Sequence, residues 1–135
     1  MYKHILVAVS FDAERDGNKA IEVARKLVDK DGVLTLLHVV EEVPGYAATY
    51  MPAGYREKTL VAINDQISEM AALVDGAQGI VVEGHSGRTI LDWSASHDVD
   101  CIVVASHRPG MQDYLLGSTA AQVVRHAPCA VHVVR

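Results

Sequence analysis

Residues 5–40 read ILVAVSFDAERDGNKAIEVARKLVDKDGVLTLLHVV, and this stretch decides the fold. It begins with a short apolar run, the pattern of a fully buried strand. From Asn18 onward, aliphatic side chains recur at helical spacing with charged residues between them, and the Asp31-Gly32 pair predicts where this helix stops. A second apolar run at 33–40 follows. The stretch therefore predicts a strand, a helix and another strand.

The same alternation continues to the end of the chain. We expect strands at 5–9, 33–40, 80–83, 101–105 and 130–134. After the first helix, we expect one that contains Leu60 to Val74, one that contains Ile90 to Ala95, and one at 118–125. A connection at 41–55, rich in proline and glycine, is unusually long for a compact domain, and such loops are either functional or mobile.

Strict alternation of helices with strands that are apolar on both faces predicts right-handed crossovers and a parallel sheet covered on two sides. The predicted fold class is α/β: a single doubly wound domain over residues 1–135, with a five-stranded parallel sheet of order 3-2-1-4-5. In such sheets a ligand lies beyond the carboxyl ends of the strands, where the strand order reverses. That point lies between the first and fourth strands, which directs attention to the loops at 10–16 and 106–116.

The composition fits one domain and argues against partners that bind by charge. The chain has 135 residues, 50% of them hydrophobic, with 12 basic and 17 acidic side chains and a formal net charge of -5. Nucleic acid and anionic membrane surfaces call for an excess of Lys and Arg. No apolar run reaches membrane-spanning length, so we expect a cytoplasmic protein without membrane insertion and without a nucleic-acid partner. Cys101 and Cys129 show no metal-ligand spacing and are expected to be reduced thiols.

The segment from Ala105 to Thr119 follows the predicted fourth strand and opens a helix. Gly117 permits close approach of a ligand to the backbone, and Ser118 and Thr119 offer hydroxyls and N–H groups at a helix start, which attracts phosphate. An alternative is that Gly117 is only a turn and that Ser118 or Thr119 is an N-cap, with Thr119 and Gln122 as a capping box. Seven histidines without paired spacing and the absence of a GxSxG motif predict neither a metal site nor a catalytic residue.

Several segments together resemble one family. They are His4 to Val9, Leu36 to Val39, Glu83-Gly84 with Ile90-Leu91, Leu115 to Ser118, and Arg125 to Arg135. The combination is similar to the bacterial universal stress proteins over nearly the whole chain, and Ala105 to Pro109 followed by Tyr114 to Ser118 looks like the F/G-type branch. The resemblance implies the same fold, an adenine nucleotide as ligand, and a homodimer through the last strand.

The resemblance also implies which residues bind ATP, with the need for Mg²⁺ left open. The predicted binding residues are Val9, Ser10, Val39, Val104, Ala105, His107, Arg108, Gly117, Ser118 and Thr119. Val39 matches the main-chain contact to adenine, His107 and Arg108 begin the phosphate loop, and Gly117 to Thr119 match the phosphate-binding helix start. The family's glycine pattern is altered, since Ala105 and Arg108 replace its first two glycines and the spacing to Gly117 is one residue shorter. Ser10 stands where the family usually has aspartate, and Asp12 or Asp16 is a candidate to compensate.

The expected function is that of an ATP-binding, nucleotide-dependent regulator of the stress response, with slow ATP hydrolysis or self-modification at Ser118 or Thr119 as a further hypothesis. One alternative is a protein-interaction module that has lost nucleotide binding and uses the 41–55 loop. The aromatic group on that loop, with Tyr46 and Tyr50, is either a lid over the base or a loop anchor. A second alternative, an adenylating enzyme, is weakened by the absence of residues for a substrate domain.

Overall fold

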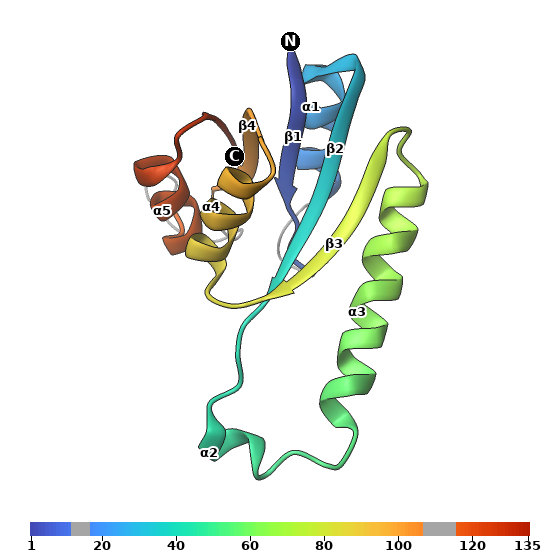
Figure 1. Ribbon diagram of the computed structural model, residues 1–135, viewed down its shortest axis with the longest axis vertical. Helices are drawn as coiled ribbons and strands as arrows, with labels where there is room; N and C mark the ends of the chain where they lie inside the picture. Colours follow the sequence, from blue (N-terminus) through green and yellow to red (C-terminus); the bar gives the residue numbers. More distant parts are fainter. Residues whose placement is uncertain (12–16, 107–115) are drawn as a thin grey trace.

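The computed structural model describes residues 1–11, 17–106 and 116–135 (Figure 1). The strands are β1 (Tyr2–Ala8), β2 (Val28–Val40), β3 (Ala77–Glu83), β4 (Cys101–Ala105) and β5 (Ala130–Val134). The helices are α1 (Gly17–Leu27), α2 (Gly45–Ala48), α3 (Tyr55–Ala72), α4 (Ser86–Ser96) and α5 (Ser118–His126). All strand pairs are parallel and the order is β3-β2-β1-β4-β5. The predicted fold class and strand order are therefore confirmed.

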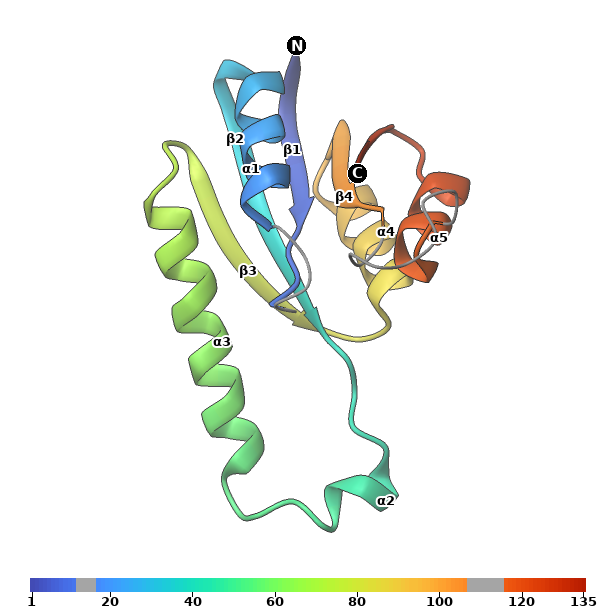
Figure 2. The same cartoon turned by 180° about the vertical axis from the view of Figure 1, so that it is seen from behind.

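The sheet separates two apolar layers. On one face, α1 and α3 pack on Ile5, Leu36 and Val103, and Figure 2 shows α1 in front of β1 and β2 on this side. On the other face, α4 and α5 pack on Leu6 and Ile102. Successive residues of a strand point to opposite faces, so neighbouring residues in β1 and in β4 serve different layers. In the described part of the chain, no helix has the length and apolar character needed to cross a membrane.

The expectation that every strand is apolar on both faces holds only for the centre of the sheet. In β4, all residues except Ala105 are buried. In the edge strand β5, Ala130 and His132 are exposed while Val131 and Val133 are half-buried against the α4–α5 layer. An edge strand pairs with another strand on one side only, so its two faces are less completely covered. Exposed and half-buried side chains therefore alternate along β5.

Three predicted strands have different boundaries in the structure, and the first of them, β1, spans Tyr2–Ala8 instead of 5–9. The first helix ends at Leu27, before the predicted stop at Asp31-Gly32, and β2 begins directly after it at Val28. The register of the β1–β2 pair shifts between Tyr2 and His4, and this irregularity accommodates residues 29–32 in the strand. The third strand begins at Ala77 instead of Ile80 and includes Gly79. A Cβ atom at Gly79 would lie 2.9 Å from the Ile67 carbonyl oxygen, so the glycine allows α3 to approach the sheet closely.

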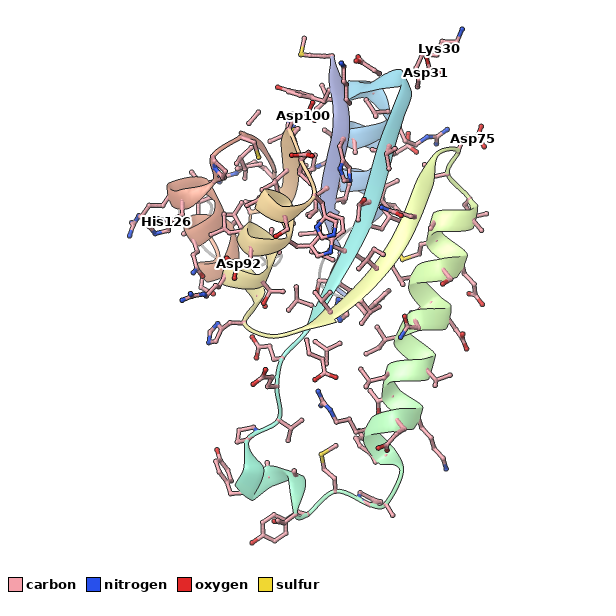
Figure 3. All side chains as sticks on the ribbon, in the orientation of Figure 1. Lys30, Asp31, Asp75, Asp92, Asp100 and His126 are labelled. Atoms are coloured by element: carbon pink, nitrogen blue, oxygen red, sulfur yellow. The ribbon has the colours of Figure 1, made fainter. Side chains whose placement is uncertain are left out.

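A hydrogen-bonded corner joins the amino ends of β1 and β4. The Asp100 carboxylate accepts hydrogen bonds from the main-chain N–H groups of Lys3 (2.9 Å) and His4 (3.0 Å). Figure 3 shows Asp100 at the end of the sheet opposite α2. Burial raises the Asp100 pKa, but the main-chain donors and the nearby His4 ring lower it more, so the pKa lies below its ordinary value. The carboxylate thus stabilises the fold in its ionised form.

Asp100→Asn should lower the free energy of unfolding at pH 7 by roughly 1 kcal/mol, because one main-chain N–H loses its charged acceptor. A carboxyl whose folded pKa is depressed stabilises the protein above its unfolded pKa, near 3.9, and that contribution is lost as the pH falls through the folded pKa. Urea unfolding at pH 7 and pH 3 should show a difference between wild type and variant that shrinks in acid. Asp75→Asn, an exposed control at the same end of the sheet, should show no such difference.

Trp93 on α4 is half-buried. Its indole stacks on the His97 ring, with ring centroids 3.8 Å apart, and meets the His4 ring edge-on at 5.9 Å. It also packs against the apolar layer beneath α4. Trp93 therefore covers part of the apolar layer beneath α4.

Candidate functional site

A pocket lies at the carboxyl ends of the central strands, where the order of the parallel sheet reverses. Its cavity volume is about 100 Å³. The lining residues come from the ends of β1, β2 and β4 and the starts of α4 and α5, with Ala20 from α1: Ala8, Val9, Ser10, Ala20, Leu37, His38, Val39, Ser86, Ile90, Val104, Ala105, Ser106, Gly117, Thr119 and Ala120. The volume is of the order that holds a single small ring, so the pocket accommodates one part of a larger ligand.

Most of the predicted site residues meet at this pocket. It is lined by Val9, Ser10, Val39, Val104, Ala105, Gly117 and Thr119. Ser118 is exposed at the start of α5 and is not among the lining residues. His107 and Arg108 lie outside the described residues, as do Asp12 and Asp16. The structure thus brings together the strand ends and the helix start that the sequence assigned to one site.

Main-chain hydrogen bonds fix the strand ends around the pocket. The Val9 N–H donates to the Leu37 carbonyl at 2.8 Å, which holds the chain after β1 against β2. The Ser106 N–H donates to the Val134 carbonyl at 2.9 Å, and the Ser106 carbonyl accepts from the Gly117 N–H at 2.5 Å. The second bond joins the residue after β4 to the residue before α5. Ser106 and Gly117 are thereby held together beside the pocket.

The start of α5 has no side-chain cap. Its N-cap is Gly117 in an extended conformation (φ -62°, ψ 160°), without a side-chain hydrogen bond to the helix. The alternative with Ser118 or Thr119 as the N-cap, and with Thr119 and Gln122 as a capping box, was therefore wrong. The first turn of an α-helix has N–H groups without intrahelical partners, and here they lie beside the pocket. This arrangement suits an anionic group of a ligand.

A second helix also begins at the pocket. The turn before α4 needs Gly84, whose φ is 149° and whose N–H donates to the Val40 carbonyl at 3.0 Å. The N-cap of α4 is His85, again without a side-chain hydrogen bond, and Ser86 lines the pocket. The turn at Gly84 thus brings a second helix start to the pocket.

Sequence reasoning missed eight lining residues: the polar His38, Ser86 and Ser106 and the apolar Ala8, Ala20, Leu37, Ile90 and Ala120. His38 and Ser106 stand at the ends of predicted strands, so the strand pattern alone could have identified them. Ile90 was assigned to a helix, and no sequence signal shows that α4 begins beside the pocket. Among the described lining side chains there is neither a carboxylate nor an ammonium or guanidinium group, and the polar ones are hydroxyls and one imidazole.

The cysteines do not supply a reactive group to the site. Burial, with smaller contributions from the neighbouring Cys129 and Asp100, raises the pKa of the Cys101 thiol to about 11. Burial also raises the pKa of Cys129. Both residues carry free thiols, as expected, and both thiols stay protonated at neutral pH. No group of three His, Cys, Asp or Glu side chains in residues 1–11, 17–106 and 116–135 has an arrangement that suits a metal ion.

The tyrosines after β2 do not contact the pocket. Residues 41–54, which we call the arm, extend beyond the carboxyl end of β2 and away from the sheet (Figure 1). Tyr46 is 77% exposed and Tyr50 is 88% exposed. Their rings are therefore not buried as loop anchors, and in this arrangement they do not cover the pocket either.

Comparisons with known proteins agree with this architecture. The universal stress protein family model matches residues 1–135. The chain is 36% identical over 141 residues to universal stress protein A homolog 2 from Coxiella burnetii, a match that covers 99% of this chain and 95% of that protein. The structure of UspA from Lactobacillus plantarum has a TM-score of 0.72 and 25% identity, and the match covers 99% of this chain and 98% of that one.

A third relative was solved with a ligand. It is a universal stress protein family protein from Arabidopsis thaliana with AMP bound, with a TM-score of 0.65 and 18% identity over 98% of this chain and 90% of that chain. At this identity the likeness shows the fold alone. The family model covers the whole chain, and the relative from Coxiella burnetii aligns along nearly its full length. The chain therefore belongs to the universal stress protein family.

Proposed function

We propose that this protein binds ATP in the pocket at the strand ends and acts as a nucleotide-dependent regulator in the cytoplasm. The observation that carries the proposal is the start of α5. This helix begins at Gly117 without a side-chain cap, directly beside a pocket whose other walls include the apolar ends of β1, β2 and β4. An apolar surface next to unpartnered helix N–H groups matches a ligand with a flat ring system at one end and phosphates at the other.

Different walls of the pocket suit different parts of a nucleotide. Val39, Val104 and Ile90 provide apolar surface for a base. The hydroxyl groups of Ser86 and Thr119 can hydrogen-bond a ribose. The cavity of about 100 Å³ has room for one ring-sized group, so the phosphates would lie outside it, toward the start of α5. The relative from Arabidopsis thaliana, which was solved with AMP, supports the choice of an adenine nucleotide.

Isothermal titration calorimetry tests the proposal. Protein freed of bound small molecules is titrated with ATP, AMP and GTP, each with and without Mg²⁺. We expect micromolar binding that prefers ATP over AMP, because the additional phosphates can interact with the start of α5. The titrations without Mg²⁺ show whether the ion contributes to nucleotide binding. An absence of heat for all three nucleotides at several temperatures would overturn the proposal.

A protein-interaction module is the second candidate, and the arm favours it. Two exposed tyrosine rings on a segment that extends away from the domain form an apolar surface without a partner in the described structure. If calorimetry detects no nucleotide, the arm becomes the first surface to test with protein partners. Micromolar ATP binding would instead leave the arm as a secondary feature.

We also propose that the protein is a homodimer through β5. This strand pairs with β4 on one side only, and an unpaired edge is commonly covered by a second subunit. In a two-fold arrangement, the central residue His132 would lie near its own copy. Val133 is a poor choice for mutation because it packs against the core, whereas His132 is exposed.

His132→Glu should convert the dimer largely to monomer, because two carboxylates would face each other across the two-fold axis. Sedimentation velocity at micromolar concentration measures the change. His126→Glu introduces the same charge at the end of α5, outside the edge strand, and should leave the dimer intact. An unchanged dimer in the His132 variant, or a monomeric wild type, would contradict the β5 interface.

A further inference from the structure

The outer face of α3 carries a set of exposed side chains. Spacings of three and four residues place Lys58, Val61, Ala62 and Asp65 on one side of the helix. Ile67, which is buried, follows Lys58 by two and a half turns and therefore lies on the opposite side. Figures 1 and 2 both show α3 along the outer edge of the molecule, and no other helix or strand of the described residues lies beyond it.

This face forms a hollow with an apolar centre and charged ends. It is lined by Glu57, Lys58, Val61, Ala62 and Asp65, and all five residues are exposed. Lys58 lies toward the amino end of α3 and Asp65 toward the carboxyl end, while Glu57 lies at the side. Within the described part of the chain, neither Lys58 nor Asp65 forms an ion pair. Four residues with this spacing form the kind of hole that receives a side chain of a second helix.

The order of the charges makes this face complementary to itself. When two copies of α3 pair in opposite directions, about a two-fold axis between Val61 and Ala62, Lys58 lies opposite Asp65 of the partner subunit, and the same pair forms twice. At the centre, Val61 lies opposite Ala62 of the partner subunit, whose small side chain leaves room for it. Pairing in the same direction would instead place each charge beside its own copy, which is unfavourable. The pattern thus selects a second copy of α3 in one orientation.

We infer that the outer face of α3 is a self-association surface, which binds the same face of a second copy in antiparallel orientation. The inference depends neither on nucleotide binding nor on β5, because α3 packs on β3, at the sheet edge opposite β5. A protein with both interfaces would join dimers into larger assemblies. The contact consists of a small apolar centre and two exposed ion pairs, so it is weak and forms only in concentrated protein. In dilute protein the α3 face is exposed to solvent.

Charge reversal tests the inference by sedimentation equilibrium, from micromolar to millimolar protein. Lys58→Glu places carboxylates opposite each other at both ends of the contact, and Asp65→Lys places ammonium groups there. Each should lower the association constant at least roughly tenfold. The double variant Lys58→Glu/Asp65→Lys restores opposite charges in the reverse order and should associate within about threefold of wild type. Added salt should weaken the association of wild type and of the double variant alike, because it screens their ion pairs.

Lys30→Glu is the matched control, since it makes the same change at an exposed position at the other end of the molecule (Figure 3) and should associate like wild type. Repeating the series in the His132→Glu background removes any contribution of β5, and circular dichroism checks the fold of each variant. Wild-type association in both single variants, or a folded double variant that does not recover, would overturn the inference. A wild type without association that depends on Lys58, even at millimolar concentration, would overturn it as well.

Discussion

Gly117→Val should weaken ATP binding at least 100-fold without disturbing the fold. Gly117 is the N-cap of α5 and lines a cavity of about 100 Å³, so the three added carbon atoms would fill much of the space that a ligand needs. They would also cover the N–H groups of the first helical turn. The backbone at this position is extended (φ -62°, ψ 160°), a conformation that valine readily adopts. The loss of binding would therefore report on the site and not on strain.

Three comparisons make this experiment specific. Gly117→Ala adds one carbon atom and should give an intermediate affinity. Ser118→Ala removes an exposed hydroxyl at the start of α5 but keeps the main-chain N–H, and should weaken ATP binding less than Gly117→Val. Gly45→Val places the same side chain on α2, where a Cβ atom meets nothing within 4 Å. Calorimetry measures the affinities and circular dichroism checks the fold. Wild-type affinity in Gly117→Val would place the nucleotide elsewhere.

Much of the fold was predictable because the strands are short apolar runs with clear ends. The predicted bounds of β4 and β5 match the structure to the residue, since Asp100 precedes one strand and Pro128 lies shortly before the other. The start of β2 was not predictable, because residues 29–32 are polar and resemble a turn. They belong to the strand only through an irregular register with β1, which is a tertiary feature.

The site was predictable where it depends on topology and unpredictable where it depends on side-chain direction. The position of the site follows from the rule that a ligand lies beyond the strand ends where the strand order reverses, whereas the resemblance to the family assigned Val9, Val39 and Val104 to it. The cap of α5 was not predictable in the same way. Ser118 and Thr119 are both common N-cap residues, but the helix begins one residue earlier, at Gly117. The resemblance to a family supplied the ligand, which composition and spacing alone do not indicate.

The attachment of α3 to the sheet depends on a narrow contact. Of the 18 residues of α3, only Ile67 and Ala71 are buried. The amino-terminal part of the helix extends beyond the carboxyl end of β3 (Figure 1). Ile67 is 0% exposed and lies where Gly79 allows close approach to β3. At the first turn, Arg56 pairs with Glu83 at 3.0 Å, a partly exposed ion pair that contributes little. Burial of Ile67 is therefore the main source of stability for this helix.

Ile67→Ala should lower the free energy of unfolding by about 3 kcal/mol, since it removes a buried side chain and leaves a cavity between α3 and the sheet. Val61→Ala is the matched control on the same helix, because Val61 is β-branched but 60% exposed. Alanine has the higher helix propensity, so intrinsic propensity favours both substitutions by a few tenths of a kcal/mol. Their difference in urea unfolding consequently isolates burial. Equal effects of the two substitutions would mean that α3 is held by its own helical stability and not by its contact with β3.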